Sequence, residues 1–304
     1  MPKSPSPLLV FLMFAGLLVA SLLAAAVMSP LVFHLVETFP IHRVFNRIAM
    51  AAFLMGTLLL LRRLSITNRE TLGFAAPRAV FLKAAFWGFA TGVGLLATVA
   101  AVIFALGIRQ WSGGHGNPFV SVLALLPGAL LSAVVVAIIE ETFFRGAMYG
   151  AIRRRGSFAM AVALTALLYS SVHFLGERFR IPVDQVDWRS GWLLLSNFFN
   201  AYRTPLAVLD GFVALTLVGA LLAIVRERMG HIGAAIGLHA GFVVVILVIR
   251  KSSELVQDQP LSWLVDQRDG IVGWLVALTT LLALPIAWKW STPPLPSDTV
   301  RSRH

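Results

Sequence analysis

The chain contains no cysteine among its 304 residues. This absence excludes disulfides, thiolate zinc sites and a cysteine nucleophile. Charged residues are also scarce, at 13%, whereas about a quarter of the residues in soluble domains are charged. Hydrophobic residues make up 58% of the chain, and its mean hydropathy is +0.82. We therefore predict an all-α polytopic membrane protein.

Acidic residues are the scarcer charged class, with 14 Asp and Glu against 25 Lys and Arg, which gives a net charge of +11. Such a balance can indicate nucleic-acid binding. Here, however, many arginines lie at the ends of apolar runs, where membrane proteins carry their cytoplasmic charge. We therefore expect no nucleic-acid partner and expect the lipid bilayer to surround the chain.

Long apolar runs recur along the whole chain. A helix needs about 20 apolar residues to cross the hydrocarbon of a bilayer, and counting such runs predicts about eight transmembrane helices in one bundle. The first run follows Lys3 and resembles a signal peptide, but it is longer than the ~7–15 apolar residues of such a segment, so we expect a retained span. The eight runs are Leu8–Val36, Val44–Leu61, Ala79–Ile108, Phe119–Ile152, Phe158–Leu175, Leu206–Val225, His231–Ile249 and Gly270–Trp288.

The remaining segments fit a single membrane domain over residues 1–290. Residues 291–304 are rich in proline and polar side chains and predict a disordered tail. The distribution of Lys and Arg between loops predicts that both termini lie on the cytoplasmic side of the cell membrane. We expect this membrane to be a bacterial inner membrane. The longest connection contains the aromatic-rich segment Asp187–Asn200, which fits either an interfacial helix or an ordinary solvated loop.

The fourth run carries three charges, at Glu140, Glu141 and Arg145, although Phe119–Ile139 before them contains none. Each ionised acid inside hydrocarbon costs ~2.5–3.5 kcal/mol on insertion scales, so a partner or a function must compensate. Glu141 and Arg145 are four positions apart, the spacing at which helix side chains meet. We expect these two to form an ion pair, which would leave Glu140 as the free acid.

His173 and His239 also fall within predicted spans. Glu140 precedes the expected turn at Gly156 by 16 residues and His173 follows it by 17, so both should lie about 25 Å along their helices from that turn. His239 lies nine residues after the turn at Gly230, or about 13 Å, which is shallower. The small residues around His239 predict close helix approach and a histidine that faces protein.

Carboxylates and imidazoles that meet inside a membrane supply a general base for water, a proton carrier and donors to a developing oxyanion. Peptide hydrolysis requires these three roles. The same groups could serve a proton-coupled transporter, but the absence of internal repeats disfavours that class. A lone histidine such as His239 is also more often a hydrogen-bonded helix contact than a catalyst.

Three motifs resemble those of the CPBP intramembrane endopeptidases, which include CAAX prenyl proteases and bacteriocin-processing or immunity proteins. The first, Glu-Glu-x-x-x-Arg, is matched by Glu140, Glu141 and Arg145. The second is an aromatic residue, usually Phe, four positions before a histidine, and Tyr169 and His173 fit it. The third, His-x-x-x-Asn or a similar polar residue, begins at His239 but has Val at position 243. The resemblance covers roughly residues 126–245.

This resemblance implies an intramembrane endopeptidase that cleaves a membrane-associated protein or peptide. Glu140 and His173 would activate the attacking water, His239 would help to hold the oxyanion, and Glu141 and Arg145 would support the site. Val243 cannot donate the hydrogen bond that the family's polar residue supplies. Other polar side chains that could replace it are Ser170, Asn197 and Asn200, although their spacing does not support them.

Two questions stay open at this point. A silent family member, acting as an immunity or scaffold protein, is the alternative that Val243 favours. Zinc is the second question, because two histidines and a carboxylate can bind it, and Glu140, His173 and His239 would be its ligands. The chain has no His-Glu-x-x-His helix, and we favour metal-free activation of water without a cofactor.

Overall fold

The computed structural model describes residues 5–35, 39–112, 117–176 and 179–290. Within these ranges the chain folds as an all-α bundle, as predicted, and six of its helices are long and apolar enough to cross a membrane. The expected count of eight is not confirmed, because two of the apolar helices, α6 and α10, are shorter than a full span. The predicted disordered tail, 291–304, lies outside the described residues.

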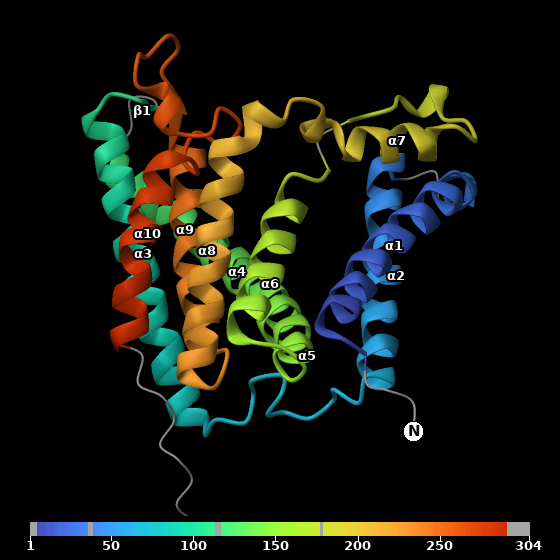
Figure 1. Ribbon diagram of the computed structural model, residues 1–304. Coiled ribbons are helices and arrows are strands. Elements are labelled where there is room, and N and C mark those ends of the chain that lie inside the picture. The colour runs from blue at the N-terminus through green and yellow to red at the C-terminus, as the bar shows by residue number, and fades with distance from the viewer. Residues whose placement is uncertain (1–4, 36–38, 113–116, 177–178, 291–304) are drawn as a thin grey trace, which may run out of the picture.

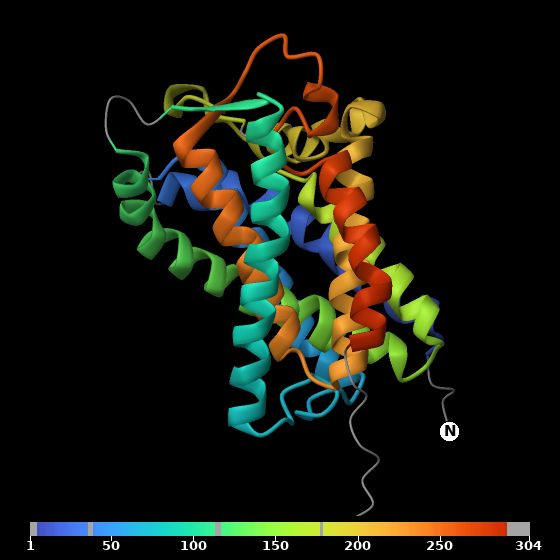
Figure 2. The ribbon, with the colours of Figure 1, turned by 90° about the vertical axis from the view of Figure 1, so that its left-hand side faces the viewer.

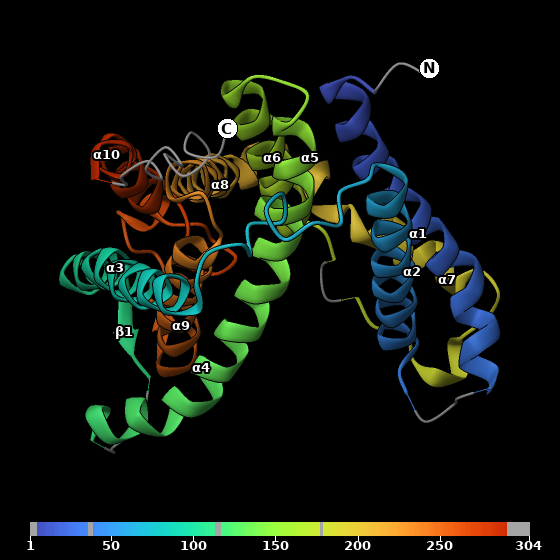
Figure 3. The ribbon, with the colours of Figure 1, turned by 90° about the horizontal axis from the view of Figure 1, so that it is seen from below.

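The helices form two groups with three central helices between them. Figure 3 shows α1, α2 and α7 on one side and α3, α8, α9 and α10 on the other, with α4, α5 and α6 in the middle. Contacts agree with this view, because α1 packs on α2 and α7, whereas α9 packs on α3 and α4. The helices are α1 (Pro7–Leu35), α2 (Ile41–Arg63), α3 (Arg78–Ala105), α4 (Pro118–Glu141), α5 (Tyr149–Arg153), α6 (Phe158–His173), α7 (Ser190–Phe198), α8 (Leu209–Met229), α9 (Gly233–Ser252) and α10 (Trp274–Trp290).

The fourth predicted span is one long rod with an irregular centre. A seven-residue π-helix, Thr142–Met148, joins α4 to α5. Such π-helical turns inside longer helices often mark functional sites. A tight turn then reverses the chain, and α6 begins after Ser157, whose side chain caps the helix by accepting a hydrogen bond from the Met160 amide. This hairpin places the end of α4 beside α6.

Glycines allow α9 to approach α3 closely, as Figure 2 shows from the side. A Cβ atom added at Gly237 would lie 1.9 Å from the carbonyl oxygen of Ala85, and one at Gly241 would lie 2.5 Å from that of Phe89. Backbones this close are typical of membrane helices with small residues at their interface. The predicted close packing around His239 is therefore confirmed.

The connections add short elements. The segment Asp187–Asn200, for which helix and loop were both open, contains helix α7, which lies across the ends of α1 and α2 in Figure 1. A two-stranded antiparallel ribbon of β1 (Arg109–Trp111) and β2 (Ser253–Leu255) joins the ends of α3 and α9. Helix α8 ends at Gly230, which has a φ of +71°, a conformation that glycine adopts readily.

Several helices carry arginine at the same end of the helical bundle. Helices α2, α5 and α8 all finish at the lower end of Figure 1, and α10 finishes there too. The last turns of α2, α5 and α8 carry arginine. The cytoplasmic location of this end stays a prediction.

Candidate active site

Glu140 lies near the end of α4, between two histidines from different helices. Its Oε2 atom is 3.8 Å from Nε2 of His173 on α6 and 3.8 Å from Nε2 of His239 on α9. The structure therefore brings all three predicted residues together. The shallower position calculated for His239 did not prevent this, because α4 runs obliquely past α9 (Figure 3) and gains less depth per residue than an upright helix.

Glu141 faces the protein interior and contacts both Arg145 and His239. Its Oε1 atom accepts a hydrogen bond from Nη1 of Arg145 at 2.9 Å, and Nδ1 of His239 lies 2.8 Å from the same oxygen. The side chains of Glu141 and Arg145 are both fully buried. The predicted ion pair is confirmed, and the link from Glu141 to His239 is an addition that helix spacing did not indicate.

Arg145 is held by three further contacts. Its Nη2 atom donates to the carbonyl oxygen of Gly219 on α8 at 3.1 Å. Its guanidinium carbon lies 4.4 Å from the ring centre of Tyr169 and 5.6 Å from that of Phe144, distances at which cation–π attraction operates. The arginine thus ties together the π-helix, α6 and α8 behind the site.

The partners of the two histidines determine which nitrogens face Glu140. Nδ1 of His173 lies 2.7 Å from the carbonyl oxygen of Tyr169. A carbonyl only accepts, so this nitrogen carries a proton and donates it. Nδ1 of His239 likewise faces the carboxylate of Glu141. Both rings are therefore oriented with Nε2 toward Glu140.

The 3.8 Å separations are too long for direct hydrogen bonds. Oε2 of Glu140 is buried and has no hydrogen-bond partner among the residues that the structure describes. Unpaired acceptors of this kind are costly unless water or a ligand satisfies them. The arrangement is thus suited to bind a water molecule between the carboxylate and the imidazoles.

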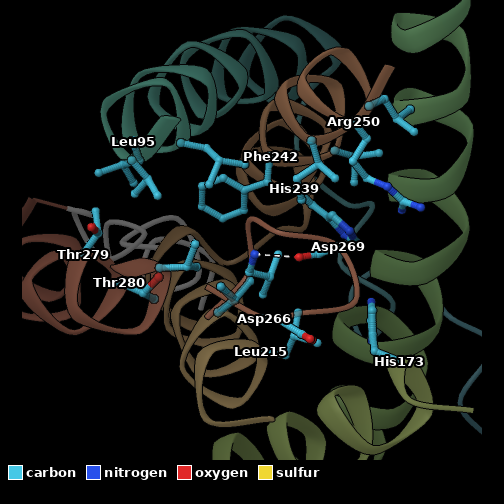
Figure 4. A pocket seen from close by; sticks show the side chains of 18 of the residues that line it. Leu95, His173, Leu215, His239, Phe242, Arg250, Asp266, Asp269, Thr279 and Thr280 are labelled. Atoms are coloured by element: carbon cyan, nitrogen blue, oxygen red, sulfur yellow. Dashed lines mark hydrogen bonds between the residues drawn. The ribbon is translucent and has the colours of Figure 1, made fainter. Parts of the chain in front are cut away.

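A cavity of about 370 Å³ opens beside the two histidines. Figure 4 shows His173 and His239 on one side of it and Leu95, Thr279 and Thr280 on the opposite side. Most of its wall is aliphatic or aromatic and comes from α3, α8, α9 and α10. The cavity therefore offers an apolar compartment next to the Glu140 carboxylate.

The loop before α10 supplies charged groups to the same cavity. Asp266, Arg268 and Asp269 line it (Figure 4 labels both acids). Burial raises the pKa of Asp266 from 3.8 to about 6, and the neighbouring acids Asp269 and Asp210 add to the rise. Sequence reasoning did not select this loop, although its charged sequence directly before an apolar run was a visible signal.

The polar residues considered as replacements for the missing donor at 243 do not contribute to the cavity wall. Ser170 donates to the carbonyl oxygen of Phe212, and the amide of Asn197 donates within α7 to Leu193. Neither of these residues nor Asn200 lines the cavity, whereas Val243 does. The side chain that should donate there, according to the motif resemblance, is therefore apolar and faces the site.

A metal site was the open question for Glu140, His173 and His239. Their chemistry suits zinc, and Nδ1 of each histidine faces an oxygen acceptor, as is typical of histidines that bind zinc. Across the described ranges, however, no three His, Asp or Glu side chains stand close enough together to hold a metal ion. The reaction proposed below uses no metal.

The fold and the site together define a multi-pass helical membrane protein with a carboxylate and two histidines beside an apolar cavity. Residues 122–245 match the family model described as type II CAAX prenyl endopeptidase Rce1-like. The match agrees with what the motifs indicated, since residues 122–245 are similar to the CPBP, or CAAX protease-like, family. Comparison with curated proteins and with solved structures gives no match.

Proposed function

We propose that the protein is an intramembrane endopeptidase that hydrolyses a peptide bond in a membrane-associated protein or peptide. The observation that carries this proposal is the unpaired Oε2 of Glu140, which lies 3.8 Å from Nε2 of both His173 and His239. The family match supports a protease in general. The apolar cavity beside the site favours an apolar substrate segment.

In the proposed reaction Glu140 removes a proton from a bound water molecule, and His173 orients that water. The water oxygen attacks the carbonyl carbon of the scissile bond, and the carbonyl electron pair moves onto its oxygen. His239 donates to this oxyanion from Nε2, which requires a protonated ring, and the carboxylate of Glu141 at Nδ1 stabilises that cation. When the carbon–nitrogen bond breaks, the proton held by Glu140 passes to the leaving amine.

The test compares new protein ends in the membrane proteomes of cells that carry wild type or Glu140→Gln. We expect a set of ends that appears only with the wild-type acid. Glu254→Gln is the matched control, because Glu254 is an exposed carboxylate on β2 that pairs with Gln110 and does not line the cavity. Identical ends in wild type and Glu140→Gln would refute the proposal.

A non-catalytic role as an immunity or scaffold protein is the second candidate, and Val243 at the cavity wall is the observation in its favour. This role needs the fold but not the acid. A cellular phenotype that is lost on deletion and fully restored by Glu140→Gln would support it over the endopeptidase.

A further inference from the structure

The hydroxyl of Tyr169 is a polar group for which the described residues supply no hydrogen bond. The chain has three tyrosines. The hydroxyl of Tyr149 donates to Glu227 at 2.7 Å, and that of Tyr202 donates to the carbonyl of Ser171. Tyr169 is only 2% exposed, and its hydroxyl hydrogen-bonds to none of the residues in the described ranges. Polar groups inside folded proteins usually have a hydrogen-bond partner, so this hydroxyl needs an explanation.

The position of Tyr169 provides one. Its side chain lines the cavity, and its ring centre lies 4.4 Å from the ring of His173 and 6.1 Å from that of His239. Phe144 packs edge-on against the ring at 5.2 Å, and Arg145 lies over its face. These contacts fix the ring beside both histidines that face Glu140.

We propose that Tyr169 is a further catalytic residue of the endopeptidase proposed above, and that its hydroxyl donates a hydrogen bond to the carbonyl oxygen of the scissile peptide as that oxygen becomes an oxyanion. The hydroxyl keeps its proton throughout. It stabilises the negative charge while the water oxygen is bonded to the carbon, and the bond weakens when the carbonyl re-forms and the amine leaves. The inference rests on the proposed hydrolysis.

Position 243, where the motif resemblance expects a hydrogen-bond donor, supplies none in this chain. Val243 is one helical turn beyond His239, lines the same cavity and has no donor. The hydroxyl of Ser170 already donates a hydrogen bond to the carbonyl oxygen of Phe212. A preorganised donor such as a phenol held by packing needs no reorganisation during the reaction, which is the property that makes oxyanion donors effective.

The experiment measures kcat and KM in liposomes, with a fluorogenic peptide made from a cleavage site that depends on Glu140. Tyr169→Phe retains the ring and its contacts and removes only the oxygen. We expect kcat to fall about 10²–10³-fold, the usual effect of losing one oxyanion donor, with KM and the thermal unfolding midpoint unchanged. Tyr149→Phe is the matched control, because its hydroxyl bonds to Glu227 outside the cavity, and its kcat should equal that of wild type.

A second variant tests the role itself. Adding Val243→Asn to Tyr169→Phe places an amide donor on the same cavity wall, and we expect it to restore at least part of kcat. Wild-type kcat in Tyr169→Phe, a loss confined to KM, or an absence of any rescue would overturn the inference. A wild-type protein no more active than Glu140→Gln would instead refute the proposed hydrolysis, so the two failures are distinct.

Discussion

Glu141 is the residue whose replacement separates stability from catalysis most sharply. Glu141→Gln preserves the shape of the side chain and an oxygen acceptor but removes its charge. The native carboxylate lies 2.9 Å from Arg145 and 2.8 Å from His239, and neither Glu141 nor Arg145 is exposed. The substitution therefore leaves a guanidinium buried without its counter-charge, and it leaves His239 without the anion that stabilises its protonated ring.

The two effects have different sizes. Removing one partner of a buried ion pair costs about 3–5 kcal/mol of stability, because the remaining charge stays desolvated. The amide oxygen of Gln still accepts hydrogen bonds, so we expect the lower end, about 3 kcal/mol. A hydrogen bond to a charged group exceeds one between neutral groups by about 1–1.5 kcal/mol, so the loss at His239 should lower kcat about tenfold.

Unfolding in a mixed detergent titration measures the first effect, and peptide cleavage in liposomes measures the second. The double variant Glu141→Gln/Arg145→Met supplies the control. It removes the stranded cation, so most of the lost stability should return, as it does when buried pairs are replaced by apolar groups. Activity should stay low, because His239 still lacks a carboxylate.

Either of two results would refute this reasoning. One is a change in unfolding free energy of less than about 1 kcal/mol for Glu141→Gln, the scale of an exposed ion pair. The other is wild-type kcat in the double variant, which would show that Glu141 acts only through Arg145.

Three further predictions concern other parts of the molecule. Burial raises the pKa of Asp266 from 3.8 to about 6, so between these pH values the folded state retains a proton that the unfolded chain has released. The unfolding free energy should therefore fall as pH rises through this window, by at most about 3 kcal/mol. A titration in which Asp266→Asn shows the same slope would contradict this. Gly237→Ala should destabilise the protein by about 1–3 kcal/mol, because the added Cβ would meet the Ala85 carbonyl. Gly94→Ala is the control and should not destabilise the protein, because a Cβ added there meets no atom within 4 Å. Equal unfolding midpoints for the two variants would exclude tight α3–α9 packing. Dialysis against a strong chelator should leave cleavage unchanged, and a loss restored by added zinc would show that the proposed metal-free reaction is wrong.

Much of the fold followed from local patterns. Apolar runs identified the long helices. The count of eight spans was not confirmed, because the runs that contain α6 and α10 include residues of the adjoining turns. The pairing of Glu141 with Arg145 is a property of one continuous rod, in which residues four apart meet. The common level of Glu140 and His173 followed from equal distances on either side of one hairpin.

The meeting of His239 with Glu140 and Glu141 could be anticipated only roughly, because it depends on the tilt between helices that are distant in sequence. Counting residues along α9 gave His239 a shallower depth than the count along α4 gave Glu140. The oblique course of α4 nevertheless brings the Glu140 carboxylate to 3.8 Å from Nε2 of His239. Helix tilt is set by packing against neighbours rather than by length. Glycines such as Gly237 permitted that packing, but their spacing did not specify the angle.

The sequence by itself determined the helical membrane fold and the buried ion pair, because each is recorded in spacing along one helix or one hairpin. The tertiary structure decided which groups share the site. It joined Glu141 to His239, placed the Asp266 loop and α10 on the cavity wall, and left the hydroxyl of Tyr169 without a hydrogen-bond partner in the described chain. These contacts arise between helices, where tilt and side-chain packing, and not periodicity, determine which atoms meet.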